Sequence, residues 1–514
     1  LSSSSAASDV YKRQNYYNHY LHKTESLFSH KRLSLANRTS LPYRQIIEYG
    51  NRKLSLYGNY HKTHGIDMKH ALVICINAMK GFVKIFTYGC QMNDLDSIKM
   101  YSMLAREGWV AARSLKEADI IILNTCSVRQ KAYEKVLSNL GRLKPYKRIK
   151  PHLIIAVTGC VAQQEGAGLI ERMPHVDIVL GTHELHRLTA MIQDVPVRKE
   201  PAIETSFSDK IPSLDLVPDR EFISPSHRAY MNIMQGCNNY CSYCIVPYVR
   251  GREISRDYPG IIEEVKGYAS SGVKEIFLLG QNVNSYSGGK TFPDLLRMIH
   301  DIDGIERIRF TTSHPKDMSD DLISCFGSLD KLCNHIHLPF QSGSNSILKD
   351  MNRDYTRETY LSLIDRLRST RPDLAFSADV MVGFPGETDK DYHETLDLIE
   401  RVRFDLLFSF RYSRRPGTES ATFRDDISEE DKLARLRKLQ DIQKKITIDI
   451  SQARIGCIFD VLVDAKSTRH EDQVFGRTTQ NAIVNFAGDP SLIGTTVKVK
   501  ISRANPNSLT GEMV

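Results

Sequence analysis

Through the second half of this chain, short apolar strands alternate regularly with polar or glycine-rich motifs. Six candidate strands, separated by helical segments, lie beyond residue 227: AYMNIM, EIFLLG, RIRFTT, HIHLPF, AFSADVMV and LLFSFRY. The motifs that directly follow them are QGCNNYC, QNVNSY, SHP, QSGSN, GFPGET and SRRPGT. Ligands of parallel α/β barrels bind at the carboxyl ends of the strands. This alternation therefore predicts an incomplete (β/α)6 barrel over residues 227–450. Its site is expected at the rim formed by the carboxyl ends of the strands.

A second parallel α/β pattern precedes the barrel, over residues 82–198. Its apolar runs are VKIFTYGC, DIIILNTC, LIIAVTGC and DIVLGT. Cys90, Cys126 and Cys160 each stand where one of these runs stops. Because the carboxyl ends of parallel strands meet at one edge of a sheet, we expect the three thiols to converge. Residues 199–226, with four prolines and no sustained periodicity, are interpreted as an interdomain linker.

A tight cysteine motif, Cys237-x-x-x-Cys241-x-x-Cys244, occupies the first position of the predicted barrel rim. A structural zinc site is usually closed by four ligands, often in C-x-x-C pairs. An iron–sulfur cubane held by three thiolates leaves one iron open to bind another molecule. The spacing favours such a cluster, and zinc or a structural cysteine loop is the alternative.

Composition describes a globular chain whose charge is unevenly placed. Of 514 residues, 41% are hydrophobic and 25% charged, and no apolar run approaches the length of a membrane span, which argues against an integral membrane protein. Residues 1–80 hold 12 basic and 4 acidic side chains, so they account for the whole net charge of +8. The remainder is neutral, and global electrostatic attraction of a polyanion cannot be argued from it.

The first 80 residues open with the low-complexity run LSSSSAASDVYKRQ and show no regular periodicity. We interpret them as a disordered or non-native leader, with the start of the folded protein near Met68 or Met79. The functional alternatives are an acid-poor organelle transit peptide and a signal peptide over residues 68–78.

Asp94 is expected to cap a helix, and Ser428 with Asp431 is expected to form a capping pair. Thr356 and Thr388 each precede an apolar stripe of helical spacing. Beyond the long charged helix that Ser428 begins, the segments GCIFDVLVDA, QVFGRTT, AIVNF and TTVKVKISRA read as strands bounded by turn residues. Residues 451–514 are therefore predicted to form a small OB-like β-barrel. Residues 455–514 carry six basic and six acidic side chains, so a generic interaction barrel is the alternative to an RNA-binding one.

Taken together, the motifs resemble a known family. The cysteine spacing with Tyr243 before the last cysteine resembles the radical S-adenosylmethionine superfamily. YGCQMN, NTCSVR, TGC, MQGCNNYCSYCIVPYVRGRE, LGQNVNSY, LPFQSGSN and GFPGET together look like the methylthiotransferases within it. NTCSVR and LGQNVNSY look most like the branch that makes 2-methylthio-N6-(dimethylallyl)adenosine in tRNA. The resemblance covers about residues 82–514, and its C-terminal part resembles the TRAM domain of RNA-modifying enzymes.

The resemblance implies two [4Fe-4S] clusters and S-adenosylmethionine as cofactors. Cys237, Cys241 and Cys244 would bind the radical-generating cluster. An auxiliary cluster would be bound by Cys90, Cys126 and Cys160. Residues expected around S-adenosylmethionine are Tyr243, Gln341, Ser342, Gly343, Gly383, Gly386 and Glu387. Residues expected to contact RNA are Arg477, Asn481, Asn485 and Lys500.

The implied reaction transfers a methylthio group to C2 of N6-(dimethylallyl)adenosine at position 37 of tRNA. The expected partners are the tRNA anticodon stem-loop and a flavodoxin- or ferredoxin-type electron donor. The expected protein is a cytoplasmic monomer without a membrane partner, and organellar only if residues 1–80 are a transit peptide. Two alternatives remain open: a methylthiotransferase acting on threonylcarbamoyl-adenosine tRNA or a ribosomal protein, and a zinc-bearing RNA-binding protein.

Overall fold

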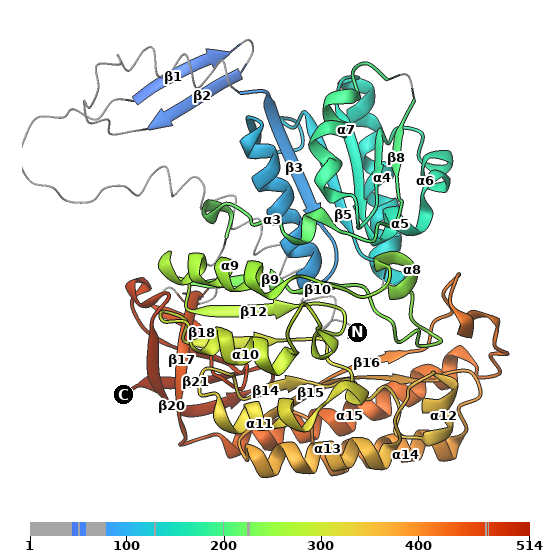
Figure 1. The fold of residues 1–514 in the computed structure, drawn as a ribbon, viewed down its shortest axis with the longest axis vertical. Helices are drawn as coiled ribbons and strands as arrows, with labels where there is room; N and C mark the ends of the chain where they lie inside the picture. The colour runs from blue at the N-terminus through green and yellow to red at the C-terminus, as the bar shows by residue number, and fades with distance from the viewer. Residues whose placement is uncertain are drawn as a thin grey trace, which may run out of the picture.

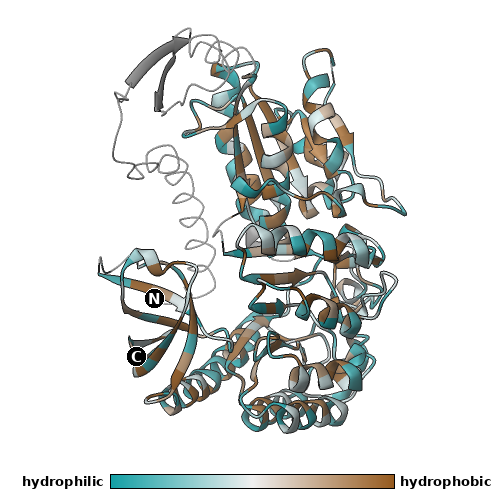
Figure 2. Cartoon of the chain, turned by 60° about the vertical axis from the view of Figure 1, so that its left-hand side comes forward, coloured by the Kyte–Doolittle hydropathy of each residue, from teal (hydrophilic) through white to brown (hydrophobic). Residues whose placement is uncertain are grey.

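The computed structural model describes residues 44–49, 52–57, 79–127, 130–198, 200–223, 227–467, 470 and 472–514. Three bodies are visible in Figure 1: an α/β sheet domain at the top, a partial barrel below it, and a closed β-barrel at the lower left. In Figure 2 the strands of the sheet domain are mostly apolar, those of the C-terminal barrel are mixed, and the outer helices carry polar faces toward solvent. This is the α/β architecture with a C-terminal β-barrel that the sequence predicts, and the prediction is confirmed.

The first domain is a six-stranded parallel sheet in the order β4-β3-β5-β6-β7-β8. Every residue of the central strands β5 and β6 is buried, which explains their uninterrupted apolar sequence. Two hydrophobic clusters cover the two faces of the sheet. The strands are β3 (Gly81–Thr87), β4 (Trp109–Ala111), β5 (Ile120–Thr125), β6 (Ile154–Gly159), β7 (Ile178–Leu180) and β8 (Ala202–Glu204). The helices are α3 (Gln91–Arg106), α4 (Gln130–Ile149), α5 (Cys160–Glu165), α6 (Ala167–Arg172) and α7 (Leu188–Asp194).

The segment 199–226, interpreted from its prolines as a linker, is packed onto this domain where the structure describes it. Its strand β8 forms the edge of the sheet beside β7. Further along, the buried Lys99 ammonium of α3 donates to the Ser213 carbonyl at 2.6 Å. Arg106 pairs with Asp219 at 2.7 Å. The connection therefore holds α3 along its length.

The second domain contains six parallel strands in sequence order, split into two three-stranded sheets, β9-β12-β13 and β14-β15-β16. Between them, Ile308 of β13 exchanges backbone hydrogen bonds with residues 331 and 333, which continues the curved wall. The strands are β9 (Arg228–Asn232), β12 (Glu275–Leu279), β13 (Arg307–Phe310), β14 (His335–His337), β15 (Ala375–Val382) and β16 (Leu406–Arg411). The predicted incomplete parallel barrel is confirmed.

Helices cover the outside of this wall, and several of them begin at a side-chain cap, of which Ser428 was predicted. Thr356, Thr388 and Ser428 each accept a hydrogen bond from the backbone three residues later. The helices are α8 (Val246–Arg250), α9 (Tyr258–Ser270), α10 (Phe292–His300), α11 (Asp320–Ser328), α12 (Asn345–Asp350), α13 (Arg357–Thr370), α14 (Asp389–Val402) and α15 (Glu429–Ala453).

The C-terminal body is a closed five-stranded barrel in the order β17-β18-β19-β21-β20. Four strands match the predicted segments, and the fifth, β21, was not predicted. It closes the barrel by pairing parallel to β19 and antiparallel to β20. The strands are β17 (Ile458–Lys466), β18 (Gln473–Arg477), β19 (Ile483–Ala487), β20 (Thr496–Asn505) and β21 (Ser508–Met513).

The C-terminal barrel docks on the amino ends of the strands of the partial barrel, opposite the rim that carries the motifs. There the buried Glu275 binds the guanidiniums of Arg228 and Arg309. Arg228 also pairs with Asp464 of β17 at 2.9 Å. The Arg307 guanidinium donates to two carbonyls of the C-terminal barrel, at 2.7 and 2.9 Å. These buried ionic contacts form a floor that ties the second and third bodies together.

The leader, expected to lack regular structure, contains an antiparallel hairpin of β1 (Arg44–Tyr49) and β2 (Arg52–Tyr57). The two six-residue segments are separated in sequence by Gly50 and Asn51, a hairpin signal that the composition-based interpretation passed over. The rest of the leader, including Met68, lies outside the described residues. In the ranges that are described, every helix is too short or too polar to traverse a lipid bilayer.

Candidate active site

Glycine shapes two of the three strand ends that carry the first cysteine trio. Gly89, before Cys90, has φ +154°, and a Cβ there would lie 2.2 Å from the Asn93 amide oxygen. Gly159, before Cys160, has φ +87°, and a Cβ there would lie 2.5 Å from a strand β5 carbonyl. Only glycine permits these close approaches. The sequence pattern Gly-Cys therefore brings each thiol tightly around the end of its strand.

A pair of asparagines fixes the distance between the first two strand ends. Asn93 donates to the Asn124 side chain at 3.0 Å, and Asn124 donates back to the Asn93 carbonyl at 2.8 Å. Asn93 also accepts from the Cys90 backbone, at 3.4 Å, so helix α3 begins at Gln91 with Cys90 as its N-cap. The expected cap at Asp94 is wrong, because the Asn93 contact starts the helix one turn earlier.

The structure brings Cys90, Cys126 and Cys160 together. A hydrogen bond from the Cys126 thiol lowers the pKa of Cys160 to about 6 against the opposing effect of burial. Cys90 is exposed at the edge of the trio, yet the surrounding protein desolvates its thiol and raises its pKa, an effect to which the nearby Cys160 charge adds. We refer to these three residues as the auxiliary trio.

The Arg250 guanidinium, from the partial-barrel domain, lies against the auxiliary trio. Its side chain is only 4% exposed, and Nη2 pairs with Asp96 of α3 at 3.1 Å. It also hydrogen-bonds the Cys160 sulfur and acts electrostatically on Cys90. A buried positive charge beside three thiols favours their anionic, metal-binding form. Arg250 lies in the YVRGRE stretch, for which the sequence pattern assigned no role.

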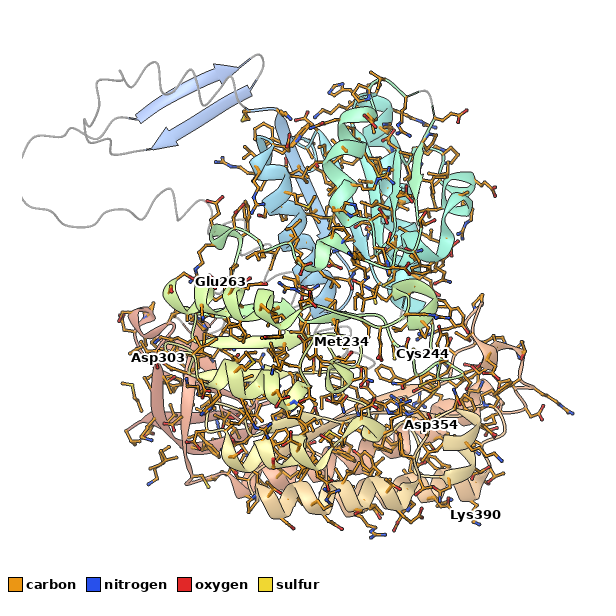
Figure 3. All side chains as sticks on the ribbon, in the orientation of Figure 1. Met234, Cys244, Glu263, Asp303, Asp354 and Lys390 are labelled. Carbon is orange, nitrogen blue, oxygen red and sulfur yellow. The ribbon has the colours of Figure 1, made fainter. Side chains whose placement is uncertain are left out.

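The second cysteine trio lies in the loop after β9 and β10 (Met234–Gln235), where the barrel rim begins. We call it the radical trio, after the role that the resemblance implies. This loop is tied to α12 by the Ser242 backbone and hydroxyl, which donate to carbonyls of residues 351 and 350 at 3.1 and 2.7 Å. Figure 3 shows Cys244 at the junction between the sheet domain and the barrel. Cys241 is buried, and Cys237 and Cys244 are partly exposed.

The charges of the radical trio act on one another. Burial raises the pKa of Cys237 to about 11, and the Cys241 charge adds to the shift. Burial, followed by the Cys241 charge, raises the pKa of Cys244 to about 12. Two arginines oppose these shifts: the buried Arg353, whose Nη1 lies 3.5 Å from the Cys241 sulfur, and Arg415, whose charge acts on Cys244. Arg353 is fixed by the Tyr355 hydroxyl at 3.1 Å and the Pro339 carbonyl at 2.9 Å.

Helix α8 joins the two trios. It follows Cys244 directly, and its residues Ile245 and Val249 pack against Cys160 of the auxiliary trio. The Thr182 hydroxyl, at the end of β7, donates to the Val249 carbonyl at 2.6 Å. A ring nitrogen of His183 lies 2.9 Å from the Arg250 carbonyl. One short helix, held by the residues that follow β7, therefore lies between the two trios.

The residues expected around S-adenosylmethionine fall into two groups. Tyr243 packs against a hydrophobic cluster that includes Phe384 of the GFPGET loop. In the QSGSN segment, Gln341 has φ +63°, and Ser342 lies near the Thr395 hydroxyl of α14 at 3.4 Å. The Gly343 backbone donates to the same hydroxyl at 2.9 Å. The QSGSN segment is thus anchored on α14.

The GFPGET loop is anchored on α15. Glu387 is buried, and its Oε2 accepts from the Gly383 backbone and from Arg435, both at 2.7 Å. Burial raises the pKa of Glu387. A Cβ on Gly383 would meet the Lys432 side chain at 2.4 Å, whereas Gly386 has open space. These contacts set the shape of the loop beside Tyr243.

Of the expected RNA contacts, three make contacts within the protein. Arg477 pairs with Asp464 at 3.4 Å in the floor and donates to Asn481 at 3.3 Å. Asn485 donates to a β21 carbonyl at 3.3 Å. Lys500 is exposed on β20.

The donor chemistry of both trios suits iron–sulfur clusters. Within the described part of the chain, no three ligating side chains are arranged to hold a single metal ion. A cubane bonds each thiolate to a different iron atom, so its ligands surround a cluster. Each trio offers three neighbouring thiols and one buried guanidinium, which is the charge that an anionic thiolate cluster needs.

Three family models match the chain. They are described as "Uncharacterized protein family UPF0004" over residues 82–181, the "Radical SAM superfamily" over residues 231–399 and the "TRAM domain" over residues 452–514. With the partial parallel barrel and its rim of thiols, these matches define a protein of the radical S-adenosylmethionine class. The class implies S-adenosylmethionine and a [4Fe-4S] cluster.

Relatives give the narrower assignment. The chain is 50% identical over 431 residues to the tRNA-2-methylthio-N(6)-dimethylallyladenosine synthase of Geotalea uraniireducens, covering 83% of this chain and 97% of the relative. The synthases of Syntrophotalea carbinolica and Neisseria meningitidis are 47% and 46% identical, covering 85% and 84% of this chain and 100% and 99% of theirs. The chain belongs to the family of tRNA-2-methylthio-N(6)-dimethylallyladenosine synthases.

Proposed function

We propose that this enzyme replaces the C2 hydrogen of N6-(dimethylallyl)adenosine at position 37 of tRNA with a methylthio group. The observation that carries the proposal is the pair of cysteine trios held against each other by α8, each with its own buried guanidinium. Adenine C2 is not acidic enough for acid–base substitution, so both a radical site and a sulfur site are needed. The names of the relatives supply the substrate class.

The proposed roles follow the geometry. Cys237, Cys241 and Cys244 hold the radical cluster, and Cys90, Cys126 and Cys160 hold the auxiliary one. When bound, the radical cluster and S-adenosylmethionine would supply the radical that removes the C2 hydrogen, with its electron coming from the external donor. Sulfur attached at the auxiliary cluster, methylated by a second S-adenosylmethionine, would supply the methylthio group.

The side chains of the protein neutralise charge and shape the cofactor site. Arg250 and Arg353 neutralise the two trios, and Tyr243 with the QSGSN and GFPGET loops shapes the S-adenosylmethionine site. The interior of the partial barrel would keep water and quenching groups from the radical.

The proposed partners are a tRNA anticodon stem-loop and a flavodoxin- or ferredoxin-type donor of single electrons. The TRAM domain holds the RNA, and the exposed Lys500 is available to a phosphate. One chain carries both trios, so a monomer suffices. Because the substrate is tRNA, we propose that the enzyme acts in the cytoplasm.

The test separates radical formation from sulfur insertion. A Cys90/Cys126/Cys160→Ala variant is expected to form 5′-deoxyadenosine under strong reductant but no methylthio product. A Cys237/Cys241/Cys244→Ala variant is expected to form neither. Methylthio product from the first variant would contradict the role of the auxiliary trio, and 5′-deoxyadenosine from the second would contradict that of the radical trio.

A further inference from the structure

Exposed aromatic side chains gather at one place on this protein. Among the side chains that the structure describes, three phenylalanine, tyrosine or tryptophan residues are strongly exposed: Phe207 at 50%, Tyr240 at 41% and Tyr248 at 48%. All three flank α8, the helix between the two cysteine trios. We call them the α8 aromatic rim.

Local contacts hold the rim in place. The rings of Tyr240 and Tyr248 meet edge to face, with centroids 6.2 Å apart and an interplanar angle of 81°. Phe207 stands edge-on to the His183 ring, at 4.9 Å, and lies beside Gly251 at the end of α8. Since His183 also contacts the Arg250 carbonyl, Phe207 is fixed to the same helix end. The three rings are thus exposed but positioned.

Tyr240 occupies a costly backbone conformation. Its φ is +45°, in the left-handed region that bulky residues rarely adopt. The Asn352 side-chain amide donates to the Tyr240 carbonyl at 3.0 Å and to the Asn239 carbonyl at 3.2 Å, which holds this turn. Because the Tyr240 ring is exposed, its packing contributes little free energy to offset this backbone strain. Strain at a well-held position beside Cys241 points to a functional demand on the side chain.

The chemistry around the rim suits RNA. Arg252, just beyond α8, is exposed. The loop carrying the exposed Arg414 packs against the radical-trio loop, because the Ser420 backbone donates to the Ser242 carbonyl at 2.8 Å. Acidic side chains are also present: Glu253 accepts from the Asn238 backbone at 3.3 Å, and Glu419 is exposed on the same loop as Arg414. Stacking surfaces beside arginines are characteristic of sites that bind unpaired bases.

We propose that the α8 aromatic rim stacks the unpaired anticodon-loop bases that neighbour the target adenosine. A base that reacts at a buried centre must leave its stack, and its neighbours then lose their partner. Rings beside the entrance to both trios would replace that lost stacking. The inference rests on the proposed function and extends it from the target base to its flanking nucleotides.

The test uses the reconstituted full chain and a prenylated anticodon stem-loop. Tyr240→Asn keeps a residue that tolerates positive φ, and Tyr248→Ser removes the second ring. The double variant is expected to bind the stem-loop at least about 30-fold more weakly, from the usual worth of two base–aromatic stacks. Tyr240→Phe and Tyr248→Phe should bind as the parent does. Ile149→Ser, which changes an exposed apolar residue outside the rim, serves as the matched control. Iron content and thermal unfolding show that each variant is folded.

A second comparison ties the loss to bases. Stem-loops with abasic sites on either side of the target should bind the parent as weakly as the double variant binds the intact loop, with no further loss when both changes are combined. Binding by the double variant within twofold of the parent would overturn the proposal, as would an equal loss with the phenylalanine variants or a full additional loss on abasic loops. Unchanged RNA binding with slower reduction by a flavodoxin would instead assign the rim to the electron donor. Because binding is measured without turnover, failure of the proposed reaction and failure of the rim are distinguishable.

Discussion

Replacing Arg250 by glutamine tests the contact that joins the two trios. The change removes the 3.1 Å ion pair with Asp96 and the hydrogen bond to Cys160. The Arg250 and Asp96 side chains are 4% and 15% exposed, so water cannot readily take over the lost partner. Breaking a buried ion pair by removing one member typically costs about 3–5 kcal/mol. That is a large fraction of the roughly 5–15 kcal/mol that stabilises an ordinary domain.

The assay for this change is hydrogen exchange in the metal-free protein under anaerobic reducing conditions. Amides of α8 and of the first turns of α3 should lose protection on the order of 10²–10³-fold, as expected for a local cost of about 3–5 kcal/mol. Arg252→Gln, an exposed arginine two residues away, is the control and should change protection by less than about threefold. Asp96→Asn should reproduce the loss, and the double variant should lose less than the sum. Equal protection in Arg250→Gln and Arg252→Gln would refute the reasoning.

Three further predictions concern the clusters and the floor. After anaerobic reconstitution the Cys237/Cys241/Cys244→Ala variant should keep about half of the parent's iron, since each trio is proposed to hold one cubane. A variant that binds no iron, or as much iron as the parent, would contradict the assignment of two cluster sites. Deleting residues 455–514 should weaken tRNA binding. It should also lower the thermal unfolding midpoint of the partial barrel, because Arg307 and Arg309 lose the carbonyls that they bind. An unchanged midpoint by calorimetry would show that the floor does not couple the domains. Burial alone raises the pKa of Glu275, but the Arg228 and Arg309 guanidiniums outweigh it and hold that pKa well below its usual range. The stabilisation from Glu275 is therefore present above its ordinary unfolded pKa of about 4.3 and is lost as pH falls below it, so urea midpoints between pH 6 and pH 3 should fall more steeply for the parent than for Glu275→Gln.

Local signals in the sequence were sufficient for much of the fold. Thr356, Thr388 and Ser428 cap their helices because a side-chain oxygen can satisfy a free backbone amide within three residues, which needs no tertiary information. The parallel barrel and the sheet were predictable for a similar reason, since apolar runs separated by amphipathic helices leave few alternatives. Cys90, Cys126 and Cys160 converge because strand ends in one sheet share an edge.

Features that depend on partners distant in sequence escaped prediction. Helix α3 begins at Gln91 because Asn93 is held by Asn124 of another strand. Strand β21 carries few strongly strand-forming residues and is defined by pairing with β19 and β20. Arg477, expected to face RNA, lies in the floor with Asp464, since the docking of two domains decides which arginines are covered.

Arg250 is the functional residue that was least predictable from the sequence. It lies in a short helix whose other residues are apolar, and no spacing rule links it to Asp96, 154 positions earlier. Its role emerges only once the sheet domain and the barrel rim are placed together.

The central claim is that one chain uses both trios to methylthiolate a prenylated adenosine. The most direct measurement is anaerobic turnover with S-adenosylmethionine on three matched anticodon stem-loops, carrying N6-(dimethylallyl)adenosine, plain adenosine or threonylcarbamoyl-adenosine at position 37, followed by nucleoside mass analysis. The prenyl group offers about 0.8 kcal/mol per buried methylene, enough over several carbons for strong discrimination. We predict 2-methylthio product from the prenylated loop and little from the other two. Equal or faster methylthiolation of plain or threonylcarbamoyl-adenosine would contradict the account.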